Sequence, residues 1–118
     1  MAVNYCAEHH PNLLKPYFGK LVDQLERDDA HPAVRRKVAR MLQFVDIPKR
    51  LDGRVFDACY NLVDDAGQPV AVRVFALTVA AKIAQNKPEL LNELRLIADK
   101  HTPHTTIAFR VRAKRVFP

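Results

Sequence analysis

Three arginines recur at nearly constant spacing along this chain of 118 residues, each after an alanine and an apolar residue. Arg35, Arg73 and Arg110 lie 38 and then 37 residues apart. Guanidinium groups in a row could bind an extended anion such as a phosphate backbone, or each could pair with a carboxylate inside the protein. Their regular spacing indicates a structural repeat.

The apolar residues around the first two arginines recur at helical spacing. Because a helix advances about 100° per residue, Arg35 shares a face with Val38 and Leu42, on the apolar side of its helix. Arg73 lies opposite the polar stripe of its own helix, which consists of Thr78, Lys82 and Gln85. A charged group on an inward face needs a partner, since burying it unpaired costs several kcal/mol.

Prolines mark a second series, half a repeat out of phase with the arginines. Pro11, Pro48 and Pro88 each precede an apolar stretch, and proline is tolerated in the first turn of a helix. Two helices per unit of this length are typical of a helical solenoid. The sequence predicts helices over residues 12–26, 32–46, 51–64, 69–85, 89–100 and 105–117. The fourth of these is apolar on most sides, which predicts a central position.

This pattern resembles the HEAT repeat family, over nearly the whole chain. The resemblance implies an all-α fold: an α-α superhelix, built as a short solenoid of antiparallel helix pairs, in a single domain over residues 1–118. The expected units are a partial first unit over 1–28, a second over 29–65, a third over 66–101 and a terminal helix over 102–118.

The resemblance also implies a role for the repeated arginines. In HEAT repeats an aspartate in a turn pairs with an arginine in the next helix, and these pairs form a ladder. Asp29 with Arg35, and Asp65 (or Asp64) with Arg73, match that pattern. A histidine and a threonine stand where the third aspartate would be, so the partner of Arg110 stays open. We favour this structural ladder over an anion-binding row.

Motifs for catalysis and for metal binding are absent from the sequence. It contains no Gly-rich phosphate loop, no Cys-x-x-Cys and no His-Glu-x-x-His spacing. Its five histidines are scattered over turns, whereas a metal site needs three or four converging ligands. The acidic turns are better placed to cap helices than to act as acid or base. We expect no catalytic residue, no metal and no cofactor, and a catalytic role in an upstream portion stays a third possibility.

The leading functional expectation is a noncatalytic scaffold that holds a protein partner. The second helix of each pair is expected to form the concave binding face. The candidate residues on those helices lie off the apolar faces, and they are Lys15, Lys20, Gln24, Arg54, Asp57, Asn61, Asn92 and Arg95.

The positive charge favours an alternative, a nucleic-acid-binding module. Nineteen Lys and Arg against thirteen Asp and Glu give a formal net charge of +6, and basic clusters can neutralise phosphates. The candidate residues are Arg36, Arg40, Arg112, Lys114 and Arg115. The chain contains no Trp and little else with which to stack bases, so this binding is expected to be weak.

The N-terminal segment and the cysteines bear on location and assembly. No segment is typical of a signal peptide or a membrane span, and two isolated cysteines indicate a reducing compartment, so we expect a cytoplasmic protein. Residues 2–8 are too few for the helix that would cover the helix over 12–26. The chain is therefore expected to begin inside a repeat, and its open end to form a dimer.

Overall fold

The computed structural model describes residues 17–27 and 31–117. Its α-helices are α2 (Phe18–Glu26), α3 (Pro32–Leu42), α4 (Lys49–Asp64), α5 (Val70–Ala84), α6 (Pro88–His101) and α7 (Ile107–Val116). The 3-10 helix η2 (Thr102–His104) joins α6 to α7, and these two ranges contain no strand. The predicted all-α fold is confirmed.

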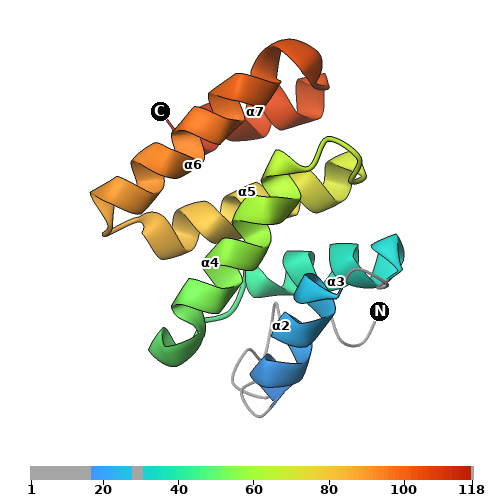
Figure 1. Cartoon of the computed structure of the whole chain (residues 1–118), viewed down its shortest axis with the longest axis vertical. Coiled ribbons are helices and arrows are strands. Elements are labelled where there is room, and N and C mark those ends of the chain that lie inside the picture. The colour runs from blue at the N-terminus through green and yellow to red at the C-terminus, as the bar shows by residue number, and fades with distance from the viewer. Residues whose placement is uncertain (1–16, 28–30, 118) are drawn as a thin grey trace.

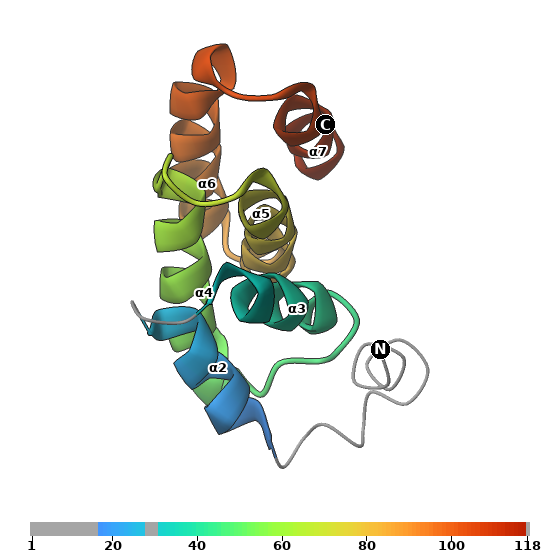
Figure 2. The same cartoon turned by 90° about the vertical axis from the view of Figure 1, so that its right-hand side faces the viewer.

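The helices form two layers (Figure 1). We call α2, α4 and α6 the outer layer and α3, α5 and α7 the inner layer. Figure 2 shows the outer layer as a column on the outside of a shallow bend, with the inner layer on the inside of that bend. Neighbouring helices within each layer contact one another, and α4 also packs against α5.

The direction of the bend differs from the sequence-based expectation. The helices over 12–26, 51–64 and 89–100 were expected to form the concave side, yet their counterparts α2, α4 and α6 lie on the outside (Figure 2). A solenoid bends toward the layer whose helices pack closer together, and that spacing depends on the side chains at the contacts. The repeat period carries no such information.

Prolines begin the helices at the predicted places. Pro48 is the N-cap of α4, and Pro88 lies in the first turn of α6. Pro11 lies outside the described residues. Pro32 begins α3, where His31 accepts a hydrogen bond from the backbone N–H of Ala33 through Nδ1, at 3.1 Å. These residues satisfy or remove N–H groups that have no acceptor within the helix.

Helix α3 ends four residues before the predicted residue 46. Its last helical residue is Leu42, and the chain turns at Gln43. The ammonium group of Lys82 donates to the carbonyl of Val45 and, at 3.5 Å, to that of Gln43. Lys82 therefore binds carbonyl groups that follow the helix, which stabilises its early end.

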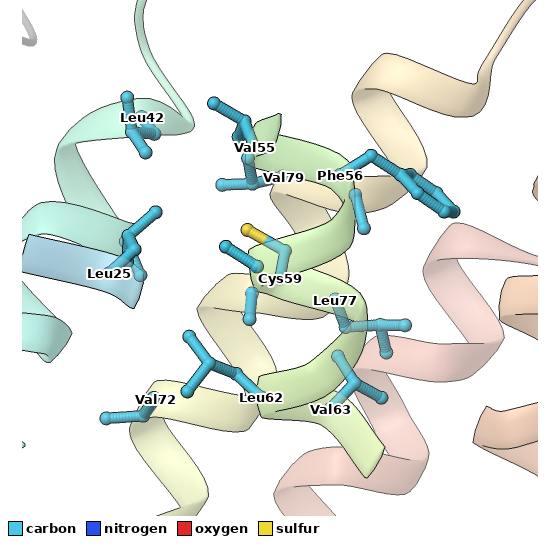
Figure 3. Packing of buried hydrophobic residues seen from close by; sticks show 14 of the residues in the cluster. Leu25, Leu42, Val55, Phe56, Cys59, Leu62, Val63, Val72, Leu77 and Val79 are labelled. Atoms are coloured by element: carbon cyan, nitrogen blue, oxygen red, sulfur yellow. The ribbon is translucent and has the colours of Figure 1, made fainter. Parts of the chain in front are cut away.

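Helix α5 is central, as its apolar composition predicts. It contacts α3, α4, α6 and α7. Side chains from α2, α3, α4 and α5 meet around it in one hydrophobic core (Figure 3). The fully enclosed members on α5 are Val72, Ala76, Leu77, Val79, Ala80 and Ala84.

The attachment of α7 depends on a single fully buried aromatic ring. Phe109 is the one buried residue of α7, with 0% exposure. We expect Phe109→Ala to lower the free energy of unfolding by about 3–5 kcal/mol, and amides of α7 to exchange faster than those of α5. The control is Ile107→Ala on the same helix, because Ile107 is 76% exposed. Urea unfolding and hydrogen exchange measure both effects, and equal shifts for the two variants would contradict this role.

Candidate functional site

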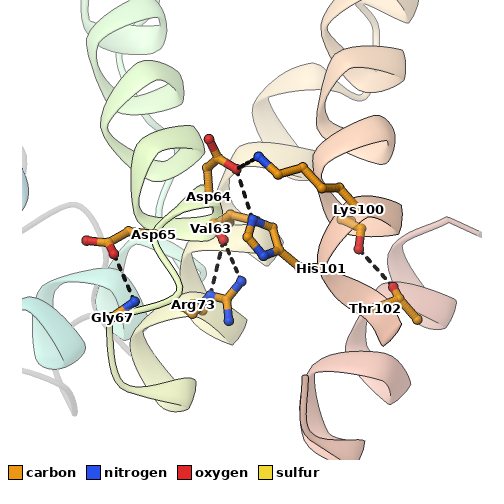
Figure 4. A network of polar contacts seen from close by, with 9 residues as sticks. Val63, Asp64, Asp65, Gly67, Arg73, Lys100, His101 and Thr102 are labelled. Atoms are coloured by element: carbon orange, nitrogen blue, oxygen red, sulfur yellow. Dashed lines mark hydrogen bonds and ion pairs between the residues drawn. The ribbon is translucent and has the colours of Figure 1, made fainter. Parts of the chain in front are cut away.

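Arg73 is buried and binds the end of the preceding outer helix. Its Nε and one terminal nitrogen donate to the carbonyl oxygen of Val63, at 3.1 and 2.9 Å (Figure 4). Val63 lies in the last turn of α4, where carbonyl groups have no N–H donor within the helix. The guanidinium carbon also lies 4.9 Å from the centre of the Phe109 ring, a cation–π distance. Arg73 thus connects α4 to α7.

The other two repeated arginines make the same kind of bond. Arg35 donates to the carbonyl of Arg27, the C-cap of α2. Arg110 donates to the carbonyl of Thr102, the C-cap of α6, at 3.1 Å. Each arginine therefore binds a carbonyl at the C-terminal end of the outer helix that precedes it. Cations are favourable there because the helix dipole is negative at that end.

The expected ladder of aspartate–arginine ion pairs needs a correction. Within residues 31–117, neither Asp64 nor Asp65 forms an ion pair with Arg73. Asp65 instead accepts hydrogen bonds from the backbone of Gly67 at 2.9 Å and from the Gln68 amide at 3.1 Å. The carboxylates act on Arg73 through space: burial lowers the pKa of Arg73, and Asp65 and then Asp64 oppose that shift. The other expected partner, Asp29, lies outside the described residues.

Gln68 connects Asp65 to the arginine of the previous repeat. It accepts a hydrogen bond from Arg35 through its side-chain oxygen at 3.4 Å, and its amide nitrogen donates to Asp65. The hydrogen bond from Gln68, and then that from the backbone of Gly67, lower the pKa of Asp65. The Nε of Arg35 is buried and has no hydrogen-bond acceptor in the part of the chain that the structure describes.

Asp64 connects the ends of two outer helices. One of its oxygens accepts from Lys100 Nζ and contacts His101 Nε2, both at 2.9 Å (Figure 4). Lys100 and His101 are the last two residues of α6. The hydrogen bond with His101, and then that with Lys100, hold the pKa of Asp64 below its usual value.

The inner layer brings together two basic clusters that are far apart in the sequence. Arg112 on α7 donates to the hydroxyl of Thr78 on α5 at 2.8 Å and to the side-chain oxygen of Gln43 at 3.2 Å. Gln43 directly follows α3, which carries the predicted residues Arg36 and Arg40. The predicted residues of α7 are Arg112, Lys114 and Arg115. The two clusters therefore lie on the helices that flank α5.

Sequence reasoning missed the polar link between these clusters. Thr78 and Lys82 were recognised as a polar stripe, but no contact could be assigned to them. Both stand on α5, and burial lowers the pKa of Lys82, with Asp46 opposing the shift. Thr78 and Lys82 are four residues apart, and this helical spacing predicts that they share one face of α5. The contact of Arg112 with Gln43 spans 69 residues and left no such signal.

Charge is separated between the two layers. The inner layer contains four basic residues in α3, two in α5 and four in α7, and no Asp or Glu occurs in these three helices. The outer helices α2, α4 and α6 carry two, three and three acidic residues beside one, three and two Lys or Arg. One layer is therefore strongly positive, and the other is nearly balanced.

The predicted protein-binding residues lie on the outer layer. Lys20 and Gln24 stand on α2, Arg54, Asp57 and Asn61 on α4, and Asn92 and Arg95 on α6; Lys15 is outside the described residues.

Two of these arginines already have partners inside the chain. Arg54 pairs with Glu26 and, at 3.0 Å, with Asp23 of α2, and these bonds, Glu26 first, raise its pKa. Arg95 lies over the Phe117 ring, 5.4 Å from its centre. Binding by this surface stays a prediction.

Groups with catalytic or metal-binding potential are few. Cys59 is fully buried, and burial raises its pKa to about 12, so the thiol stays protonated near neutral pH. The described residues contain no group of three or more His, Cys, Asp or Glu that could hold a metal ion. In the same residues, each helix is too short or too polar to cross a membrane.

Comparison with known proteins identifies a family. A family model described as a HEAT repeat domain matches residues 2–117. No curated protein and no solved structure matches the chain.

The arginine–carbonyl bond predicts a difference between Arg73→Ala and Arg110→Ala. The two arginines make the same bond, but Arg73 is 5% exposed and Arg110 is exposed. Arg73→Ala should lower the free energy of unfolding by roughly 2–3 kcal/mol, because it leaves a buried carbonyl without its donor. Arg110→Ala should have a clearly smaller effect, because water can replace the guanidinium. Urea midpoints measure both, and equal losses would show that burial does not matter for this bond.

The lowered pKa of Asp64 predicts a pH-dependent part of the stability. The ionised carboxylate stabilises the fold above the unfolded-state pKa of about 4, and this contribution is lost as the pH falls through the lowered folded-state pKa. Asp64→Asn should therefore lose less stability than the parent between about pH 5 and about pH 3. Asp57→Asn, an exposed position on the same helix, is the control and should follow the parent. Urea unfolding at both pH values decides, and parallel curves for Asp64→Asn and the parent would refute the role of this group.

Proposed function

Because the chain belongs to the HEAT repeat domain family, we propose that it is a noncatalytic interaction scaffold that binds its partner through the inner layer. Stacked helical repeats bury a continuous core and present one extended face for binding. The observation that carries the choice of face is the absence of Asp and Glu from α3, α5 and α7, which hold many Lys and Arg. A face of one sign attracts a partner of the opposite sign and speeds its association.

The charges of the outer layer are arranged differently, which supports this choice. Arg54 pairs with two acidic residues of α2, and Lys100 pairs with Asp64. Lys87, just before α6, lies 3.7 Å from a carboxylate oxygen of Asp52 on α4. Because these charges neutralise one another within the layer, the outer face has less net charge to offer a partner.

A noncatalytic role agrees with the chemistry of the described residues. The one cysteine among them is buried and protonated near neutral pH, whereas a nucleophilic cysteine needs an exposed thiol with a lowered pKa. The basic side chains of the inner layer are suited to binding anions.

Amide chemical shifts during a titration test the choice of face. We expect heparin, a sulfated polyanion, to shift the amide signals of α3 and α7, while those of α4 and α6 move little. A neutral dextran of similar length is the control and should shift neither set. Shifts concentrated on α4 and α6, or the absence of any response, would contradict the proposal.

A further inference from the structure

We propose that the inner layer binds a nucleic acid through its phosphate backbone, without selecting particular bases; this inference rests on the proposed function. The positive charge of the inner layer would suit either a nucleic acid or an acidic protein. Two observations favour the nucleic acid: the arrangement of the arginines and the fixed position of the Arg112 guanidinium.

Arginines form rows on both sides of α5. Arg36 and Arg40 stand four residues apart on α3, and Arg112 and Arg115 stand three apart on α7. Residues at these separations share one face of a helix. The contact of Arg112 with Gln43 joins the α7 row to the end of α3. Guanidinium groups bind phosphate oxygens in a bidentate manner, so paired rows suit an extended chain of phosphates.

Single apolar side chains are exposed beside each of these rows. A protein interface is usually centred on buried apolar or aromatic anchors. Val111 stands four residues before Arg115 on the same face of α7, and it is 45% exposed. Among the described residues, Phe44 is the exposed aromatic side chain next to the α3 row, at 45% exposure. A backbone-binding surface does not need such anchors.

The central guanidinium is held in place by the protein. Thr78 and Gln43 both accept hydrogen bonds from Arg112, which is only partly exposed. Neighbouring Lys82 is held by two carbonyl groups at the end of α3. Because the centre is already ordered, binding a phosphate there costs little additional side-chain entropy.

Duplex binding by two charge-matched double variants of the full chain tests the inference. The probe is a fluorescent DNA duplex of about two helical turns, roughly 20 bp, measured by anisotropy near 0.1 M salt. Arg36→Glu with Arg115→Glu replaces one positive charge by a negative charge in each row and should weaken binding at least tenfold. It should also reduce the slope of log affinity against log salt by about two, since each phosphate contact contributes about 0.9.

The matched control changes the net charge equally on the opposite layer. Lys20→Glu with Lys49→Glu places the same substitutions on α2 and α4, where both lysines are exposed, and should change the affinity less than threefold. Thermal unfolding followed by circular dichroism establishes that both variants are folded. Equal weakening by the two double variants would overturn the inference, because binding would then depend on net charge alone.

Three further measurements separate the possible partners. Unrelated duplex sequences should bind with similar affinity, and strong sequence selectivity would overturn binding through the backbone. Phe44→Ala should leave duplex affinity nearly unchanged, whereas a large loss would indicate an aromatic anchor instead. Binding to poly-glutamate without binding to DNA would refute the nucleic acid and keep the scaffold. Binding to neither probe would contradict the proposed inner face itself.

Discussion

The hydrogen bond from each repeated arginine to the end of the preceding outer helix is the interaction on which the rest of the structure depends. A helix leaves its last carbonyl groups without donors, and the packing of two layers places those groups where water has limited access. Arg73 supplies both donors to Val63 and is itself buried. The bond therefore satisfies a helix end and a buried charge together. It also fixes how closely an inner helix approaches the outer helix before it.

This constraint accounts for the separation of charge between the layers. The arginine stands in the first turn or so of each inner helix, close to the negative end of an outer helix. An acidic side chain on the same inner helix would compete with the carbonyl for the guanidinium. The carboxylates near Arg73 lie instead in the turn, where Asp65 is held by Gly67 and Gln68. The helices α3, α5 and α7 carry no acidic side chain that could compete in this way.

The sequence allowed the helices and the burial of two arginines to be predicted, because both follow from periodic patterns. The spacing of apolar residues placed Arg35 and Arg73 inside, at 7% and 5% exposure. It could not identify the acceptors, since a backbone carbonyl is the same at every residue and leaves no mark in the sequence. The aspartates were the visible candidates, and the ion pair expected for Arg73 is not formed. The link between Arg112 and Gln43 depends on the packing of three helices and was equally hidden.

A bond to the main chain also affects how such a protein can change over time. The arginine donor and its carbonyl acceptor lie 8, 10 and 8 residues apart in the sequence. Each bond joins two consecutive helices: α2 and α3, α4 and α5, or α6 and α7. A tandem duplication of two such consecutive helices would copy both the donor and the acceptor. The new copy would therefore contain its own arginine–carbonyl hydrogen bond. Substitution of the acceptor residue leaves its carbonyl oxygen in place. The residue type at that position can therefore vary, whereas the bond needs the arginine side chain. The third pair illustrates this freedom, because Arg110 finds its carbonyl at Thr102 without any aspartate in the turn.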